Sequence, residues 1–463
     1  MYFDDSVQCT VNGVSTRPVF LSRGLRQGCS LSPILFALYI MEIGEDLSAS
    51  SEGFGVGNVI ISCLLFADDI LLVSRTAAGL RRLIRIVKSC CDSLKPVINT
   101  GEDKSEVVSP TDDIWDFFDS FGNLDLSLRQ VLEYNYLGLD TRTSILRTSL
   151  SKQAKCITVA NSYKFACLRL GRRGPDVVDV SLATWINIAL PTILFGCESI
   201  LFKESNILAI ERIQAQVAKI VLGVSANTVN ICAQTELGLF TFRHLLYRLQ
   251  LKFYFRVLDL PDSRWVKQAL LDHLALAWPS PYLAYITSIR QEIMLHFVPP
   301  TMRYLNVHLS QWSLSVTNQA ISTLKLPYVQ PLMKFSRQLY VYEHVHLNTI
   351  AEFRLSNAGL GNRHPRFPSQ HLYSRSSACP FCPSVTLTES HVVFFCDKVE
   401  RFRQEFELPF FRNLCRSKGF SEEDTFALYV NGKDWNGTVV LPLEYDARGL
   451  AMDTIRGHWL SLW

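Results

Sequence analysis

Short runs of apolar residues, rich in Ile, Leu and Val, dominate the chain around residue 65. Val59–Phe66 and Ile70–Val73 flank the pair Asp68-Asp69. Each run is short, so each predicts a buried strand rather than a helix, and the carboxylates are expected at the tip of a hairpin. Burying two such groups unpaired would cost roughly several kcal/mol per ion. We therefore expect them to face a cation, and Mg²⁺ is the usual partner of carboxylates where phosphates are handled.

Turn residues and helical spacing predict the neighbouring elements. Asn12-Gly13, between two β-prone segments, is the strongest short signal for a hairpin. Ser32 as N-cap and Pro33 at the first helical position predict the start of a helix. Apolar residues recur at helical spacing over Ala77–Leu94, and the arginines between them indicate a solvated face.

Composition limits the class of protein. The 463 residues are enough for two or three domains with real cores, and a hydrophobic fraction of 48% excludes a disordered chain. A net charge of +3 does not indicate a nucleic-acid binder, so any such binding must come from local basic surfaces. The 13 cysteines occur without a secretory signal, which indicates a reducing compartment. No uninterrupted apolar run predicts a transmembrane helix, so we expect no membrane partner.

An Asp-Asp dipeptide alone is a common turn, and the neighbouring motifs decide its interpretation. Upstream lies GLRQGCSLSPILF, Gly24–Phe36, and downstream come Lys104 and Tyr136-Leu137-Gly138. In this order, the motifs resemble those of the reverse transcriptases of non-LTR (LINE-type) retrotransposons. The resemblance runs from residue 1 to about residue 260.

The resemblance implies a role for each matching residue. The catalytic palm motif corresponds to Phe66–Asp69, so Asp68 and Asp69 would hold Mg²⁺. The remaining roles are template and nucleotide positioning by Gln27, Gly28 and Lys104, and a primer grip formed by Tyr136, Leu137 and Gly138. The implied partners are an RNA template and a DNA primer, which favours a location in the nucleus or cytoplasm.

A concentration of Lys and Arg follows the predicted primer grip, between residues 142 and 173. A basic helical stretch is what a polymerase thumb needs, because thumbs hold duplex phosphates with these side chains. The alternative interpretation is scattered surface charge.

A second group of chemistry-bearing residues lies near the C-terminus, with the spacing C-x₂-C-x₈-H-x₄-C. Its members are Cys379, Cys382, His391 and Cys396. Three thiolates and one imidazole make a closed tetrahedral Zn²⁺ site, which is structural rather than catalytic. A chance CxxC is the alternative, but the fitting His and Cys argue against it. LINE-type proteins often carry such a CCHC motif. Nearby basic residues, Arg401 and Arg403 among them, could contact phosphates.

The fold class expected from these patterns is α+β and mostly helical. We expect a partial reverse-transcriptase palm over 1–144, a helical thumb-like region over 145–260, a helical connecting region over 261–370, a CCHC zinc-knuckle-like module over 371–415 and a C-terminal tail over 416–463.

The resemblance also implies an incomplete polymerase. In the family, the first catalytic carboxylate and the fingers precede the hairpin at Asn12-Gly13. We therefore expect an N-terminally truncated reverse transcriptase that is inactive alone unless a partner chain supplies the fingers. The alternative from another class is a domesticated, non-catalytic nucleic-acid-binding protein that uses the thumb and zinc module. A third is a product with no function.

Overall fold

The computed structural model describes most of the chain. The described residues are 6–20, 24–26, 28–56, 59–101, 104–109, 128–142, 144–169, 175–275, 280–324, 378–379, 381–386, 388, 390–431, 436 and 442–462. The chain divides into two compact units. The first contains Met1–Tyr134 and Val257–Pro279, and the second contains Asn135–Arg256 and Ser280–Trp463. Gln27 and the aromatic, acidic stretch Thr111–Asp125 lie outside the described residues.

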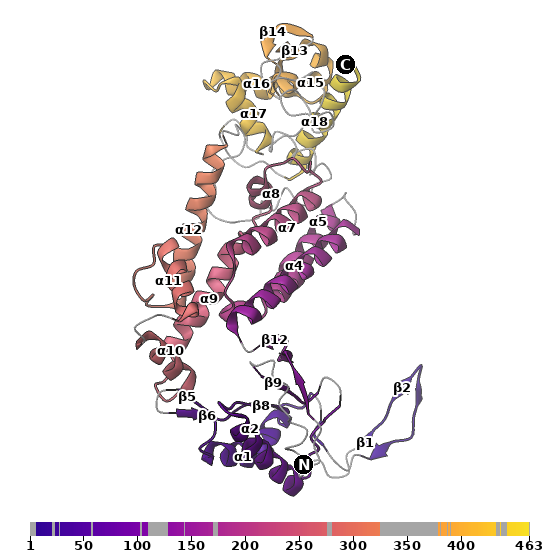
Figure 1. Ribbon diagram of the computed structural model, residues 1–463. Helices are drawn as coiled ribbons and strands as arrows, with labels where there is room; N and C mark the ends of the chain where they lie inside the picture. The colour runs from indigo at the N-terminus through magenta and orange to yellow at the C-terminus, as the bar shows by residue number, and fades with distance from the viewer. Residues whose placement is uncertain are drawn as a thin grey trace. The chain divides into compact units, whose positions relative to one another are not determined.

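Helices make up most of the described chain (Figure 1). They are α1 (Ser32–Ala49), α2 (Ala77–Leu94), α4 (Ile145–Arg169), α5 (Pro175–Thr184), the π-helix η1 (Trp185–Ala189), α6 (Leu190–Leu194), the 3₁₀ turn η2 (Cys197–Ser199), α7 (Glu204–Leu222), α8 (Asn230–Glu236), α9 (Phe242–Leu258), α10 (Trp265–Ala275), α11 (Pro281–Glu292), α12 (Met302–Thr323), the π-helix η3 (His391–Phe395), the 3₁₀ turn η4 (Asp397–Val399), α15 (Glu400–Glu405), α16 (Leu408–Ser417), α17 (Glu422–Val430) and α18 (Pro442–Leu462).

The strands of the described ranges are short and form two-stranded sheets. They are β1 (Ser6–Val7) with β4 (Val19–Phe20), β2 (Thr10–Val11) with β3 (Val14–Ser15), β5 (Phe54–Val56) with β6 (Val59–Ile61), β7 (Cys63–Phe66) with β8 (Asp69–Leu72), β9 (Glu106–Val108) with β10 (Arg129–Val131), β11 (Glu133–Tyr136) with β12 (Leu139–Arg142), and β13 (Ala378–Cys379) with β14 (Cys382–Thr386). The β9–β10 pair is parallel. The expectation of a largely helical chain with small β-hairpins is confirmed.

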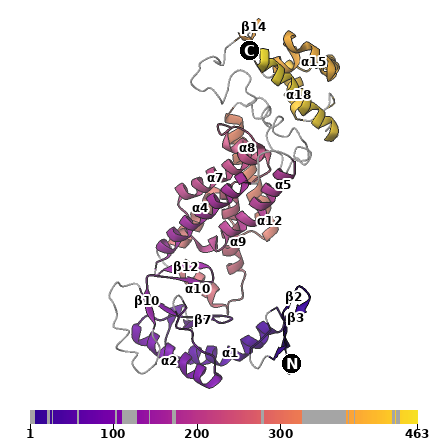
Figure 2. The same ribbon diagram turned by 90° about the vertical axis from the view of Figure 1, so that its right-hand side faces the viewer.

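Helices α1 and α2 pack against each other in the first unit and form its main core (Figure 2). Helix α2 has the predicted bounds, and Leu83 and Val87 are buried on its apolar face. The start of α1 differs from prediction, because Leu31 is the N-cap. Ser32 is the first helical residue, and its hydroxyl donates to the carbonyl of Arg26 instead of capping the helix.

The hairpins of the first unit follow local turn chemistry. Asn12 and Gly13 both have positive φ, 50° and 80°, as a type I′ turn requires, and the predicted hairpin is confirmed. The expected buried run Val59–Phe66 is instead two short strands, because β6 pairs with β5 and β7 pairs with β8. Its end is also exposed rather than buried, with Phe66 62% exposed.

The second unit contains a bundle in which α7 packs against both α4 and α8 (Figure 2). Trp185 lies fully buried in this bundle, and its indole nitrogen donates to Gln214 Oε1 at 3.3 Å. Gly223 ends α7 in the left-handed conformation that favours glycine.

The C-terminal part of the second unit is organised around Phe394, which is fully buried. Its ring contacts those of Phe411, Phe426 and Tyr429 at centroid distances of 5.3 to 6.3 Å. These aromatic residues come from η3, α16 and α17, so the core links three elements of this module. No helix in the described part of the chain is long and apolar enough to cross a membrane.

Candidate functional site

The Asp68-Asp69 pair lies at the tip of the β7–β8 hairpin, as predicted. Phe66 pairs with Asp69, which leaves Ala67 and Asp68 as a two-residue turn. Ala67 has a φ of 51°, a left-handed value that residues other than glycine adopt infrequently. Backbone strain of this kind clusters at functional sites. Both carboxylates are exposed, so they are accessible to a ligand.

The base of this hairpin is packed although its tip is exposed. Ile70 and Leu72 contact the core formed by α1 and α2. A Cβ at Gly44 of α1 would lie 3.0 Å from Leu65 Cδ1, so the glycine lets β7 approach the helix closely. The helices therefore fix the hairpin that presents the two carboxylates.

Tyr134 brings Lys104 into the neighbourhood of this hairpin. Its hydroxyl donates to the carbonyl oxygen of Lys104 at 2.9 Å. Burial raises the pKa of Tyr134, and the negative charges of Asp69 and Glu106 raise it further. Because Asp69 acts on the same hydroxyl that binds the Lys104 backbone, these two predicted site residues lie in one neighbourhood. The Lys104 side chain is exposed.

The predicted positioning loop is described only in part. Gly28 is exposed and has a φ of 82°, and a Cβ there would meet nothing within 4 Å. The loop at this residue therefore leaves space for a ligand beside the backbone. Gln27, its predicted partner, is outside the described ranges.

The predicted primer grip is a second tight hairpin, β11–β12. Leu137 and Gly138 form its turn, with φ values of 49° and 81°. The Gly138 amide donates to Asn135 Oδ1 at 3.1 Å, which holds the turn closed. A Cβ at Gly138 would lie 3.0 Å from Phe195 Cε1, so the turn lies against the end of α6.

Asp140 fastens this hairpin to helix α4. Its carboxylate forms an ion pair with Lys155 and accepts hydrogen bonds from Asn135 Nδ2 at 3.1 Å and from Ser151 Oγ at 3.4 Å. Burial disfavours the charged carboxylate, but these donors outweigh it, and the pKa of Asp140 is lowered. The residues of the predicted primer grip are therefore held by the helix that follows them.

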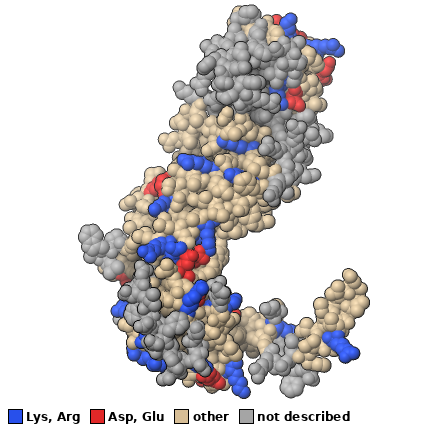
Figure 3. Space-filling model, turned by 45° about the vertical axis from the view of Figure 1, so that its right-hand side comes forward, with Lys and Arg blue, Asp and Glu red and all other residues tan. Residues whose placement is uncertain are grey.

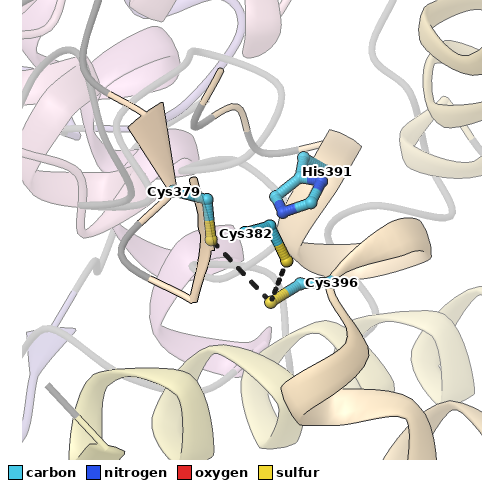
Figure 4. Close-up of side chains that lie close together, drawn as sticks. All are labelled: Cys379, Cys382, His391 and Cys396. Atoms are coloured by element: carbon cyan, nitrogen blue, oxygen red, sulfur yellow. Dashed lines mark hydrogen bonds between the residues drawn. The ribbon is translucent and has the colours of Figure 1, made fainter. Parts of the chain in front are cut away.

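The four predicted zinc ligands come together in the C-terminal module (Figure 4). The ligand atoms of Cys379, Cys382, His391 and Cys396 all lie within 4.8 Å of one another. Two sulfurs come from the β13–β14 hairpin, where Cys379 pairs with Cys382. The other two ligands flank η3, whose Cys396 amide donates to the His391 carbonyl at 2.7 Å. A π-turn closes over five residues, so it brings His391 and Cys396 side by side.

The sulfur positions fit a metal ion rather than a disulfide. The Cys396 sulfur lies 3.9 Å from that of Cys379 and 4.0 Å from that of Cys382. A disulfide requires about 2.05 Å. Zinc–sulfur bonds of about 2.3 Å in a tetrahedral site place two sulfurs about 3.8 Å apart. The observed spacing is close to this value.

The polar environment of the cluster also suits a cation. His391 Nε2 is buried and has no hydrogen-bond partner. Burial, and then the charge of Arg403, lower the pKa of His391 and favour the neutral imidazole, the form that binds metals. Burial, followed by the neighbouring Cys379 and Cys382, raises the pKa of Cys396 to about 12, so its thiolate needs a compensating cation.

Comparison with known proteins bears on the first part of the chain. Residues 1–141 match the family model described as "Reverse transcriptase (RNA-dependent DNA polymerase)". A stretch of 73 residues is 40% identical to the "Retrovirus-related Pol polyprotein from type-2 retrotransposable element R2DM" of Drosophila melanogaster. That stretch covers 16% of this chain and 7% of the fly protein.

Together, these two matches support a non-LTR reverse-transcriptase region in this chain. The matched residues 1–141 contain the Asp68-Asp69 hairpin, Gly28, Lys104 and the turn predicted to form the primer grip. The cysteine-histidine cluster lies outside residues 1–141, so only its geometry supports the zinc prediction.

The prediction that Arg403 could contact phosphates is wrong. Arg403 is buried, with 1% of its surface exposed, and its guanidinium is engaged inside the protein. Arg412 was not singled out, and it donates to the carbonyl of Phe394 at 2.7 Å. Both arginines bind the backbone of residues 392–396, and neither sequence spacing nor charge signals this contact.

Proposed function

We propose that this chain carries part of an RNA-directed DNA polymerase, the reverse transcriptase of a LINE-type retrotransposon. One observation carries the proposal. Asp68 lies in the strained two-residue turn and Asp69 follows it as the first residue of β8, so two exposed carboxylates are adjacent inside the segment that matches the reverse-transcriptase family. A hairpin whose base packs against two helices and whose tip is exposed can present carboxylates to Mg²⁺ without burying them.

Within this proposal, Asp68 and Asp69 bind Mg²⁺, which supplies charge stabilisation for phosphoryl transfer when bound. Gln27 and Gly28 position the template and the base pair, and Lys104 lies beside the nucleotide. The primer is held so that its 3′ hydroxyl faces the α-phosphate of the incoming nucleotide.

A two-metal site needs carboxylates from more than one strand. Within the described ranges, no third His, Cys, Asp or Glu side chain lies close enough to Asp68 and Asp69 to share an ion with them. The remaining ligand therefore comes from a segment outside these ranges or from a partner chain.

The hairpin of Tyr136, Leu137 and Gly138 holds the primer end in this proposal, and helix α4 acts as a thumb element. Helix α4 contains five Lys and Arg residues and no Asp or Glu, so its surface attracts phosphates. On the face shown in Figure 3, Lys and Arg side chains are scattered among uncharged residues rather than gathered in one patch. The affinity for nucleic acid is therefore expected to be moderate and to decrease as the salt concentration rises.

The cysteine-histidine cluster is proposed to hold one structural Zn²⁺. Its sulfur spacing, its orphaned imidazole nitrogen and its donor set all fit that ion. Four protein ligands leave no open position, so the role of the ion is to stabilise the module and not to catalyse a reaction.

The test is primer extension on a primed RNA template with Mg²⁺. The wild-type chain is compared with Asp68→Asn, Asp69→Asn and a control, Asp92→Asn, which removes an exposed carboxylate of α2. Extension by the wild-type chain is expected only where a segment outside the described ranges or a partner chain supplies the remaining ligand. In that case both hairpin variants abolish the extension and the control retains it. Extension that survives both hairpin variants would show that another site performs the reaction.

A second function, nucleic-acid binding without catalysis, is favoured by the absence of a third carboxylate from the described site and by the basic helix α4. It predicts that primed template binds in low salt even after Asp68→Asn and Asp69→Asn. It also predicts that Cys379→Ser abolishes this binding. Binding that persists in both Asp variants and is lost in Cys379→Ser would favour this function over the first.

A further inference from the structure

Arg403 is one of the largest fully buried side chains in the described part of the chain. It lies on α15, a short helix that follows the last cluster ligand, Cys396, by way of η4. A buried guanidinium requires an acceptor for each of its donors and compensation for its charge. Its surroundings therefore indicate what it does.

The guanidinium of Arg403 binds both ends of the turn that carries two of the cluster ligands. Nη2 donates to the carbonyl of Cys396 at 2.5 Å, and Nη1 donates to the carbonyl of Val392, the residue after His391, at 3.4 Å. Glu400 provides the third partner, because its carboxylate accepts from Nε at 2.8 Å and pairs with Nη2 at 2.6 Å.

We propose that Arg403 is a positioning residue for the zinc site, holding the His391–Cys396 turn in its metal-binding conformation and offsetting the charge of the thiolates. This inference rests on the zinc site proposed above. A π-turn is a rare conformation and needs support from its surroundings. A planar guanidinium can bridge two carbonyls at fixed spacing, which a lysine cannot do.

Charge supports the same role. Three thiolates, one neutral imidazole and a Zn²⁺ ion carry one net negative charge, and Arg403 is a buried cation bound to the carbonyl of a ligand. Glu400 balances that cation only in part, because its side chain is 42% exposed and therefore screened by solvent. Residues that orient metal ligands in this way typically change metal affinity 10- to 100-fold when they are replaced.

The competing explanation is that Arg403 only fills space in the core of the module. Two features of the test separate these roles. One is the zinc affinity of protein that remains folded, and the other is the visible spectrum of the Co²⁺-loaded protein, which reports the geometry of the ligands. A space-filling role changes the melting temperature but leaves both of these readouts unchanged.

The experiment compares the full wild-type chain with Arg403→Met, Arg403→Lys and Arg401→Met. Arg401 lies on the same helix and its side chain is 88% exposed, so it controls for the loss of an arginine. Zinc affinity is measured by competition with a chromophoric chelator, and circular dichroism confirms that each variant is folded. Arg403→Lys keeps the charge, so it keeps the test decisive if Arg403→Met does not fold.

We expect one zinc ion per wild-type chain. Arg403→Met should bind zinc 10- to 100-fold more weakly and have an altered Co²⁺ spectrum. Arg403→Lys should lose less zinc affinity, and Arg401→Met should match the wild-type chain. Wild-type affinity and spectrum in both Arg403 variants would overturn the inference and leave the zinc site standing. A wild-type chain that binds no zinc would overturn the zinc site itself, and the inference with it.

Discussion

Gly196 and Leu139 meet so closely that the glycine has no room for a side chain. A Cβ at Gly196 would lie 2.3 Å from Leu139 Cδ2, and its φ of 69° is left-handed. Leu139 begins β12, the second strand of the hairpin that carries the predicted primer grip. The end of α6 and this hairpin are therefore packed together, and a Cβ at Gly196 would force the Leu139 side chain to move.

Gly196→Ala is expected to destabilise the second unit by about 2 to 4 kcal/mol, because it adds a steric clash to the cost of left-handed backbone. Gly419→Ala is the matched control, since Gly419 has a φ of 82° but a Cβ there would meet nothing within 4 Å. We expect the control to cost only about 1 kcal/mol. Denaturant unfolding monitored by circular dichroism measures both. Equal losses would show that the Leu139 contact relaxes freely.

The Asp140–Lys155 ion pair predicts a pH-dependent attachment of the same hairpin. The pKa of Asp140 is lowered in the folded chain, so its stabilising effect is complete above the ordinary pKa of an aspartate and is lost as the pH falls through the lower, folded-state pKa. Asp140→Asn should destabilise the chain by about 1 kcal/mol at neutral pH and by progressively less in acid. Unfolding curves at several pH values test this. A loss that stays constant into strong acid would contradict it.

Ala67 provides a test of strain at the Asp68-Asp69 hairpin. Ala67→Val should destabilise the hairpin by about 1 to 2 kcal/mol, because a β-branched residue fits positive φ poorly. Ala67→Gly should not destabilise it, since glycine adopts this backbone without steric cost. Amide hydrogen exchange of β7 and β8 measures the local effect. Faster exchange in the glycine variant than in the valine variant would refute the left-handed turn.

Removing the metal should unfold the C-terminal module selectively. Chelation, or Cys379→Ser, is expected to expose η3 and α15–α17 to limited proteolysis, because the four ligands join the β13–β14 hairpin to the π-turn. Cys9→Ser, which replaces an exposed cysteine, is the control and should remain protected. The readout is the cleavage pattern by mass spectrometry. A chelated chain as resistant as the metal-loaded chain would argue against a structural ion.

The sequence by itself determined the elements whose causes are local. Asn12-Gly13 specifies its turn through backbone preference, the apolar spacing over Ala77–Leu94 defines α2, and the C-x₂-C-x₈-H-x₄-C spacing identified four residues that the fold brings together. The ordered motifs also indicated the reverse-transcriptase resemblance, which the comparisons confirm for residues 1–141. Motif residues and turn residues are readable in this way because they lie close together along the chain.

Only the tertiary structure decided which polar groups and side chains meet in the folded chain. Ser32 was predicted to cap α1, but its hydroxyl donates a hydrogen bond to the Arg26 carbonyl instead. Arg403 has the sequence signature of a surface charge, yet it is buried because carbonyls of the folded η3 turn and Glu400 receive its donors. A side chain at Gly196 would clash because Leu139, far from it in sequence, packs against it. Burial and close approach depend on which segments meet in space, and local sequence preferences do not encode that choice.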